Sequence, residues 1–224
     1  AKDFGHKVID QVPGLIGINL KNNFSLAGLT LKNVELKVLK DKKNLSREFG
    51  EMLFTHRGIS GPIVLTTSSK INRLKDFEMY LDLKPALDPE KLDARILRDF
   101  HENQNKNIEN VMKSLLPRDL ISYVLEGAGI SGDKKVNQIT KEDRESLIRT
   151  IKNFSLKFDS LDDIDRAIVT SGGVDVKDID PKTMESKKVK GLYFIGEVLD
   201  LDGLTGGFNI QIANSTGYSC GINL

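Results

Sequence analysis

The sequence predicts a mixed α/β (α+β) protein: a β-barrel-like domain, a small helical subdomain inserted into it, and a C-terminal strand–helix piece of a larger domain. Three observations predict this class. Strand-like runs fill residues 1–86 and return in residues 154–186. Between them, residues 87–153 have apolar side chains at helical spacing. Residues 187–224 contain an uninterrupted apolar run, a glycine-rich loop and a helical pattern.

The first 86 residues are predicted to be rich in β-strands. Val34–Leu39 and Phe77–Leu83 alternate apolar and polar side chains, which is the pattern of half-buried strands. A short helix is expected after Ser60, because Pro62 stands where a helix can begin. Further strand-like runs, separated by glycine and asparagine clusters, are Val8–Ile9, Leu15–Ile18 and Glu51–Thr55.

The segment from about residue 88 to 152 is predicted to form about four helices. Leu92, Ile96 and Phe100 share one helical face, and Thr140–Asp143 resembles a capping box at a helix start. Gly127–Gly132 fits the spacing of a dinucleotide-binding loop. That loop needs a strand before it, whereas the preceding residues have helical spacing. We therefore expect a glycine C-cap and a loop between two helices.

Residues 154–186 are predicted to complete the β-rich domain, so the helices are interpreted as an insert. Phe154, Leu156 and Phe158 alternate, and Ala167–Thr170 is strand-like. Thr170–Val174 is interpreted as a turn with free amides and hydroxyls. The alternative for this segment is a β-turn that closes the barrel.

The last segment predicts one strand and one helix. Leu192–Ile195 is apolar without alternation, which suits a strand buried on both faces. Phe208–Ile222 is expected to be helical, with small residues at four-residue spacing for close packing. One strand and one helix cannot form a doubly wound sheet. Their partners are expected in a missing segment or another chain. The start at Ala1 likewise predicts a fragment, with processing of the chain as the alternative.

The composition excludes several classes of function. Lys plus Arg total 33 and Asp plus Glu total 32, which argues against nucleic acid as the main partner. The single cysteine, Cys220, excludes an internal disulfide and a thiolate metal cage, and no metal site is predicted. We expect a reducing cytoplasm. No apolar run approaches the roughly 18 residues of a membrane span, so no membrane partner is expected.

A glycine-rich and acidic constellation between residues 196 and 211 is the strongest candidate site. Glycines allow close backbone approach, and amides at Gly206–Phe208 could stabilise the negative charge that a reduced flavin develops. Carboxylates could accept hydrogen bonds from ribityl hydroxyls. The alternative is a glycine-rich turn with a solvated acidic loop. The predicted cofactor-binding residues are Gly196, Glu197, Asp200, Asp202, Gly203, Thr205, Gly206, Gly207, Asn209 and Gln211.

Four segments together resemble the BaiN/YhiN-type flavoproteins, also called aminoacetone oxidase-like. They are Gly5–Ile9, Phe54–Pro62, Val169–Val174 and Glu185–Gln211, so the resemblance covers essentially all 224 residues. The family's architecture implies a Rossmann-like FAD domain assembled from both chain ends, a β-barrel-like middle domain and a helical insert. The domain boundaries expected are 1–86 and 154–186 for the barrel, 87–153 for the insert, and 187–224 for the FAD-domain piece.

The resemblance also implies a function. The full-length protein is expected to be a bacterial, cytoplasmic oxidoreductase that binds FAD non-covalently and transfers a hydride to or from a small-molecule substrate, with NAD(P)H or oxygen completing the cycle. The N-terminal FAD-binding part is missing, so this fragment alone is expected to be inactive and free of FAD. Thr170, Gly172 and Gly173 are placed on the substrate side, and no catalytic acid or base is assigned. The alternative is a non-catalytic binding module built from the barrel and the helical insert.

Overall fold

The computed structural model describes residues 1–224, which divide into two compact units. The chain passes between the units four times, three of them within a short strand: β2 (Ile18–Leu20), β5 (Gly58–Ser60) and β8 (Phe158–Leu161). The predicted domain boundaries separate β-rich segments from helical ones, whereas the two units are defined by contacts, so the boundaries stay predictions. The first unit comprises Ala1–Asn19, Ile59–Lys75 and Asp159–Leu224, and the second comprises Leu20–Gly58 and Asp76–Phe158.

Antiparallel strands form the sheet of the second unit, in the order β7-β6-β3-β4, and β5, β2 and β8 complete the strand order. The hairpin of β3 and β4 turns at Asp41 and Lys42, which both have positive φ, as a tight hairpin turn requires. Leu36 and Val38 are fully buried, so alternate residues of β3 face the core. The four strands are β3 (Thr30–Lys40), β4 (Lys43–Phe54), β6 (Glu78–Asp82) and β7 (Phe154–Leu156).

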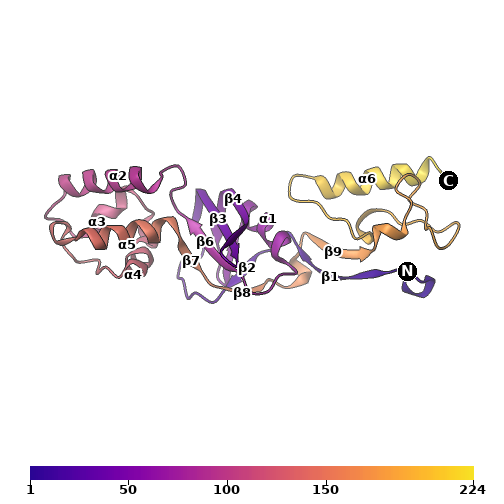
Figure 1. Ribbon diagram of the computed structural model, residues 1–224, viewed down its shortest axis with the longest axis horizontal. Coiled ribbons are helices and arrows are strands. Elements are labelled where there is room, and N and C mark those ends of the chain that lie inside the picture. The colour runs from indigo at the N-terminus through magenta and orange to yellow at the C-terminus, as the bar shows by residue number, and fades with distance from the viewer. The chain divides into compact units, whose positions relative to one another are not determined.

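Helices make up the rest of the second unit, and Figure 1 draws α2 and α5 alongside each other. The predicted capping box is confirmed, because the Thr140 side chain accepts from the Asp143 amide and the Asp143 side chain accepts from the Thr140 amide. Gly129 follows the helix that ends at Ala128 and has a left-handed φ of 73°, which confirms the expected glycine C-cap. The elements are α2 (Pro89–Glu102), α3 (Ile108–Val111), η2 (Met112–Ser114), α4 (Arg118–Ala128), η3 (Val136–Gln138) and α5 (Lys141–Lys152).

A buried carboxylate, Asp82, joins the helices of this unit to its strands. Its Oδ2 atom lies 3.3 Å from Lys37 Nζ on β3 and 2.7 Å from Lys152 Nζ at the end of α5. Its Oδ1 atom accepts from the Lys84 amide at 3.0 Å. Lys152 also donates to the carbonyls of Lys84 and Leu87. With side chains 4%, 14% and 13% exposed for Asp82, Lys37 and Lys152, the ions exchange most of their water for one another.

The first unit pairs two strands that lie far apart in the sequence. Strands β1 and β9 are antiparallel, with Val8 opposite Val174 and Gly14 opposite Val169. Helix α1 begins at Pro62, as predicted. A small apolar core holds the C-terminal loops, and it contains Val174, Ile179, Met184, Phe194, Leu199 and Cys220. The elements are η1 (Lys2–Phe4), β1 (Val8–Gly14), α1 (Pro62–Ile71), η4 (Ile164–Arg166), β9 (Val169–Val174), η5 (Val176–Asp178), η6 (Gly196–Val198) and α6 (Phe208–Gly221).

Three local predictions are wrong. Leu192–Ile195 is not a strand: only Tyr193 forms a bridge, to Glu185, and Ile195 is 44% exposed, because no strand of the chain flanks the segment. Thr170–Val174 is a strand and not a turn, since β1 supplies its hydrogen-bonding partner. Leu15–Ile18 is not one strand: β1 ends at Gly14, Leu15 has a positive φ of 50°, and the next strand begins only at Ile18. No helix combines the length and the apolar character needed to cross a membrane.

Replacing Asp82 with alanine is expected to lower the free energy of unfolding by about 3–5 kcal/mol, because two largely buried ammonium groups lose the carboxylate that they share. Urea denaturation followed by circular dichroism measures the change. The exposed Glu51→Gln is the matched control and should stay within about 0.5 kcal/mol of the wild type. Equal stability of the Asp82 variant and the control would show that this ion cluster does not hold the unit together.

Acid should weaken the start of α5. A hydrogen bond from the Lys134 ammonium, with the Thr140 amide, lowers the pKa of Asp143 below its usual range. A lowered folded pKa gives stability that is present above the unfolded value of about 3.9 and is lost as pH falls through the folded value. Asp143→Asn should therefore cost about 0.5–1 kcal/mol at pH 7 and flatten the decline between about pH 5 and 3. The free energy of unfolding of both proteins is measured across that pH range. An equally steep decline for the wild type and the variant would contradict this prediction.

Candidate functional site

Two glycines let the backbone of β9 lie unusually close to its neighbours. A Cβ on Gly173, whose φ is 132°, would lie 2.4 Å from the Val198 carbonyl oxygen. A Cβ on Gly172, whose φ is 118°, would lie 2.5 Å from the Asp10 carbonyl oxygen. Arg73 crosses the same place and donates to the Asp10 and Ser171 carbonyls. Only glycine permits this packing, because any side chain would separate the segments.

A carboxylate fastens β9 to the loop that follows residue 195. Glu197 Oε1 accepts from the Thr170 amide at 2.7 Å and from Thr170 Oγ1 at 3.0 Å. The Asp200 amide donates to the Val174 carbonyl at 2.8 Å, so the loop continues along the strand. The two predicted site segments, the substrate-side strand and the cofactor loop, are therefore neighbours.

The loop before α6 is closed by its own hydrogen bonds. The Asn209 side chain accepts from the Gly203 amide and donates to the Gly203 carbonyl, both at 2.8 Å. Gly206 and Gly207 have φ of 109° and 85°, which turn the chain into the helix. No side chain caps the first turn of α6, so the backbone N–H groups of that turn remain available as hydrogen-bond donors. A Cβ on Gly207 would meet nothing within 4 Å, so the space beside the turn is open.

Helix α6 is attached by one edge only. Thr216 Oγ1 accepts from the Gly196 amide at 2.9 Å, and Thr216 and Cys220 are the buried residues of the helix. Phe208, Ile210 and Tyr218 are 59%, 69% and 70% exposed. A 14-residue helix with so little of its apolar surface covered is typical of an interface.

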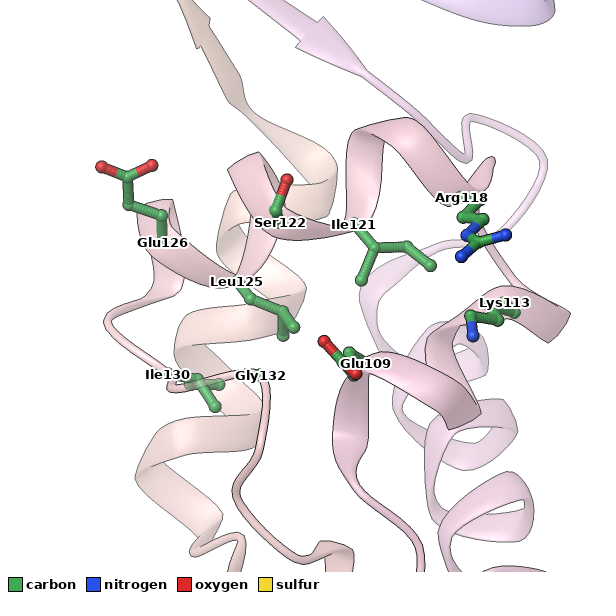
Figure 2. Close-up of a pocket in the computed structure, with 9 residues that line it drawn as sticks. All are labelled: Glu109, Lys113, Arg118, Ile121, Ser122, Leu125, Glu126, Ile130 and Gly132. Atoms are coloured by element: carbon green, nitrogen blue, oxygen red, sulfur yellow. The ribbon is translucent and has the colours of Figure 1, made fainter.

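A separate pocket of about 520 Å³ lies in the helical part of the second unit. Figure 2 shows the Glu109 carboxylate pointing towards its middle, Lys113 and Arg118 at one end, and the Glu126 carboxylate pointing away. Helical spacing alone does not reveal this pocket, since residues from three separate segments make its walls. The lining residues are Glu109, Lys113, Arg118, Ile121, Ser122, Leu125, Glu126, Ile130 and Gly132.

Comparison with known proteins identifies the family. The model of the "HI0933-like protein barrel and H2TH domain" matches residues 12–169. The chain belongs to the HI0933-like family. This match confirms the predicted mixed α/β class with a barrel and a helical domain, and the relatives below confirm the resemblance to BaiN-type proteins.

Three curated relatives of this HI0933-like chain carry names that describe an activity. Ribosomal RNA dihydrouridine synthase of Escherichia coli K12 is 33% identical over 100% of this chain and 54% of its own length. The protein of the same name from Haemophilus influenzae is 36% identical, over 79% and 42%. The 3-dehydro-bile acid delta(4,6)-reductase of Clostridium scindens is 29% identical, over 99% and 55%. The chain thus spans about half the length of these relatives.

The remaining predicted site residues of the HI0933-like chain lie in the loop between η6 and α6 or in α6 itself. Thr205 Oγ1 lies 3.4 Å from Thr66 Oγ1 on α1. Gln211 donates to Ser215 within α6. The side chains of Asp200 and Asp202 are half-buried and make no hydrogen bond within the chain. Sequence reasoning missed Arg73 as a support of β9, because its partners are backbone carbonyls remote in sequence.

Gly173→Ala is expected to lower the free energy of unfolding by about 2 kcal/mol or more, since its Cβ would overlap the Val198 carbonyl. Gly191→Ala is the matched control, because Gly191 also has positive φ but open space around it, and should cost about 1 kcal/mol. Hydrogen exchange of the Asp200 amide should accelerate only in the Gly173 variant. The same exchange rate in both variants would rule out the close approach.

Proposed function

We propose that this chain is the barrel, helical and C-terminal part of a flavoprotein reductase that binds FAD non-covalently. The relatives' names support it: one is a reductase, and dihydrouridine is uridine with two hydrogens added across a carbon–carbon double bond. Both names describe reduction at unsaturated carbon. We therefore propose that the hydride passes from the flavin to the substrate, and not in the opposite direction. FAD would supply the hydride when bound. NAD(P)H is the proposed electron donor.

The turn before α6 fits the edge of a flavin ring. The first-turn amides of α6 have no side-chain cap, and the space beside Gly207 is open, whereas a Cβ on Gly206 would lie 3.5 Å from the Phe208 ring. We propose that these amides stabilise the negative charge of the reduced ring. The Asn209 side chain already holds Gly203, so its role is to shape the loop. Asp200 and Asp202 keep free carboxylates for ribityl hydroxyls.

Glu197 is proposed to position the substrate-side strand. Its Oε1 atom holds Thr170, while no group of the chain bonds its Oε2 atom. The exposed apolar side chains of α6, Phe208, Ile210 and Tyr218, are proposed to be covered by the rest of the FAD domain. The chain alone is then expected to bind FAD weakly and to lack activity, as the sequence predicts.

A uridine of ribosomal RNA is the proposed substrate. Two of the three relatives carry that activity in their names, at 33% and 36% identity, against 29% for the bile-acid reductase. The near balance of 33 basic and 32 acidic residues predicted no nucleic-acid partner. Totals average over the whole surface and do not describe local patches, so we favour RNA over the small molecule first expected.

The full-length protein should purify with a flavin absorbance band near about 450 nm and form dihydrouridine in ribosomal RNA with NAD(P)H. Glu197→Ala should weaken FAD binding or turnover about tenfold, because Thr170 loses both hydrogen bonds. The exposed Asp165→Ala is the control and should match the wild type. Purified protein without flavin, yet able to bind a partner through the barrel, would favour the non-catalytic binding module instead.

A further inference from the structure

We propose that the helical pocket binds one nucleotide of RNA, with a phosphate at Lys113 and Arg118 and a base other than uracil against Glu109. The pocket lies between the α3–η2 segment, α4 and the loop after Gly129. The inference rests on the proposed function only in taking RNA as the substrate class. It assigns the helical part a role in holding the RNA away from the base that is reduced.

The size and walls of the pocket suit a nucleotide. Its volume of about 520 Å³ lies within the usual range of about 300–1,000 Å³ for small-molecule sites. Ile121 and Leu125, on one face of α4, and Ile130, after its C-cap, form an apolar floor of which only 3%, 2% and 5% of each residue is exposed. RNA recognition targets unstacked bases, and the edge of such a base could rest on this floor.

The two cations at one end of the pocket are not neutralised by acidic groups (Figure 2). Arg118 is exposed and makes no hydrogen bond or ion pair through its guanidinium. Lys113 Nζ donates to Asn110 Oδ1 at 2.6 Å, which is a neutral partner. A phosphate would give both cations a counterion, and guanidinium groups bind phosphate oxygens in pairs. This end of the pocket therefore favours an anionic group.

The exposed Glu109 points its carboxylate towards the middle of the pocket and decides which base can enter (Figure 2). Glu109 has no partner for its side chain, and its amide donates to the Gly132 carbonyl at 3.2 Å, which fixes its backbone. Gly132 leaves room for it, because a Cβ there would lie 3.1 Å from Glu109 Oε2. A carboxylate only accepts hydrogen bonds. Guanine offers two adjacent N–H donors and cytosine an amino group, whereas the single N–H of uracil stands between two carbonyls.

This selectivity separates the pocket from the reaction. Dihydrouridine forms from uridine, and the uracil edge would place carbonyl oxygens against the Glu109 carboxylate. The pocket therefore holds a neighbouring nucleotide, guanosine above all. A bile-acid or fatty-acid carboxylate would satisfy the cations but would leave Glu109 unpaired beside an apolar body. A basic peptide would satisfy Glu109 but would meet Lys113 and Arg118.

Binding of fluorescent RNA eight-mers to the full-length flavoprotein tests the proposal. The oligonucleotides are oligouridine with one central guanosine, and oligouridine alone. The wild type should prefer the guanosine strand by at least about fivefold. Glu109→Gln should remove most of that preference, because the amide also donates to uracil carbonyls. Arg118→Ala should weaken both strands about three- to tenfold and reduce the salt dependence by one phosphate contact.

The control is Arg149→Ala, an exposed arginine of α5 outside the pocket, which should change affinity less than about twofold. Flavin content and dihydrouridine formation are measured on the same preparations. The pocket proposal alone would be overturned if the protein held flavin and formed dihydrouridine but showed no guanosine preference, or if Arg118→Ala had no more effect than Arg149→Ala. If the protein neither formed dihydrouridine nor bound any RNA, the proposal of an RNA substrate would be overturned as well. A protein that purified without flavin would overturn the proposed reductase.

Discussion

The ion cluster around Asp82 is the constraint on which the second unit depends. One carboxylate on the last residue of β6 holds an ammonium group from β3 and another from the end of α5, so strands and helices meet at a single buried charge. A buried ion pair needs good geometry and further hydrogen bonds to offset the loss of water around its charges. Removing Asp82 takes from both buried ammonium groups the carboxylate that they share. The cluster therefore fixes where the helices that line the pocket attach.

The first unit depends on close backbone approach instead of charge. Gly172 and Gly173 bring β9 against β1 and the 196–200 loop, and Glu197 locks the two segments together through Thr170. The result is a small rigid support that holds a loop and the uncapped start of α6 in place. Most of α6 remains exposed, which is typical of a helix that packs against a further domain or chain.

Much of the fold follows from local sequence signals. The capping box at Thr140, the helix start at Pro62 and the C-cap at Gly129 were predictable because each depends on residues within one turn. Leu192–Ile195 failed because an apolar run becomes a strand only where another strand pairs with it. The contact of Glu197 with Thr170 and the pocket around Glu109 depend on segments remote in sequence, and a single sequence carries no signal of such pairing.

The pairing of β1 with β9 has a consequence for synthesis. Val8 of β1 pairs with Val174 of β9, so β1 leaves the ribosome long before its partner strand has been synthesised. The helices of the second unit make mostly local contacts and can form in the meantime. During that interval β1 presents an open hydrogen-bonding edge, the kind of surface that recruits other chains. The yield of folded protein should therefore depend on how long this edge stays unpaired during synthesis.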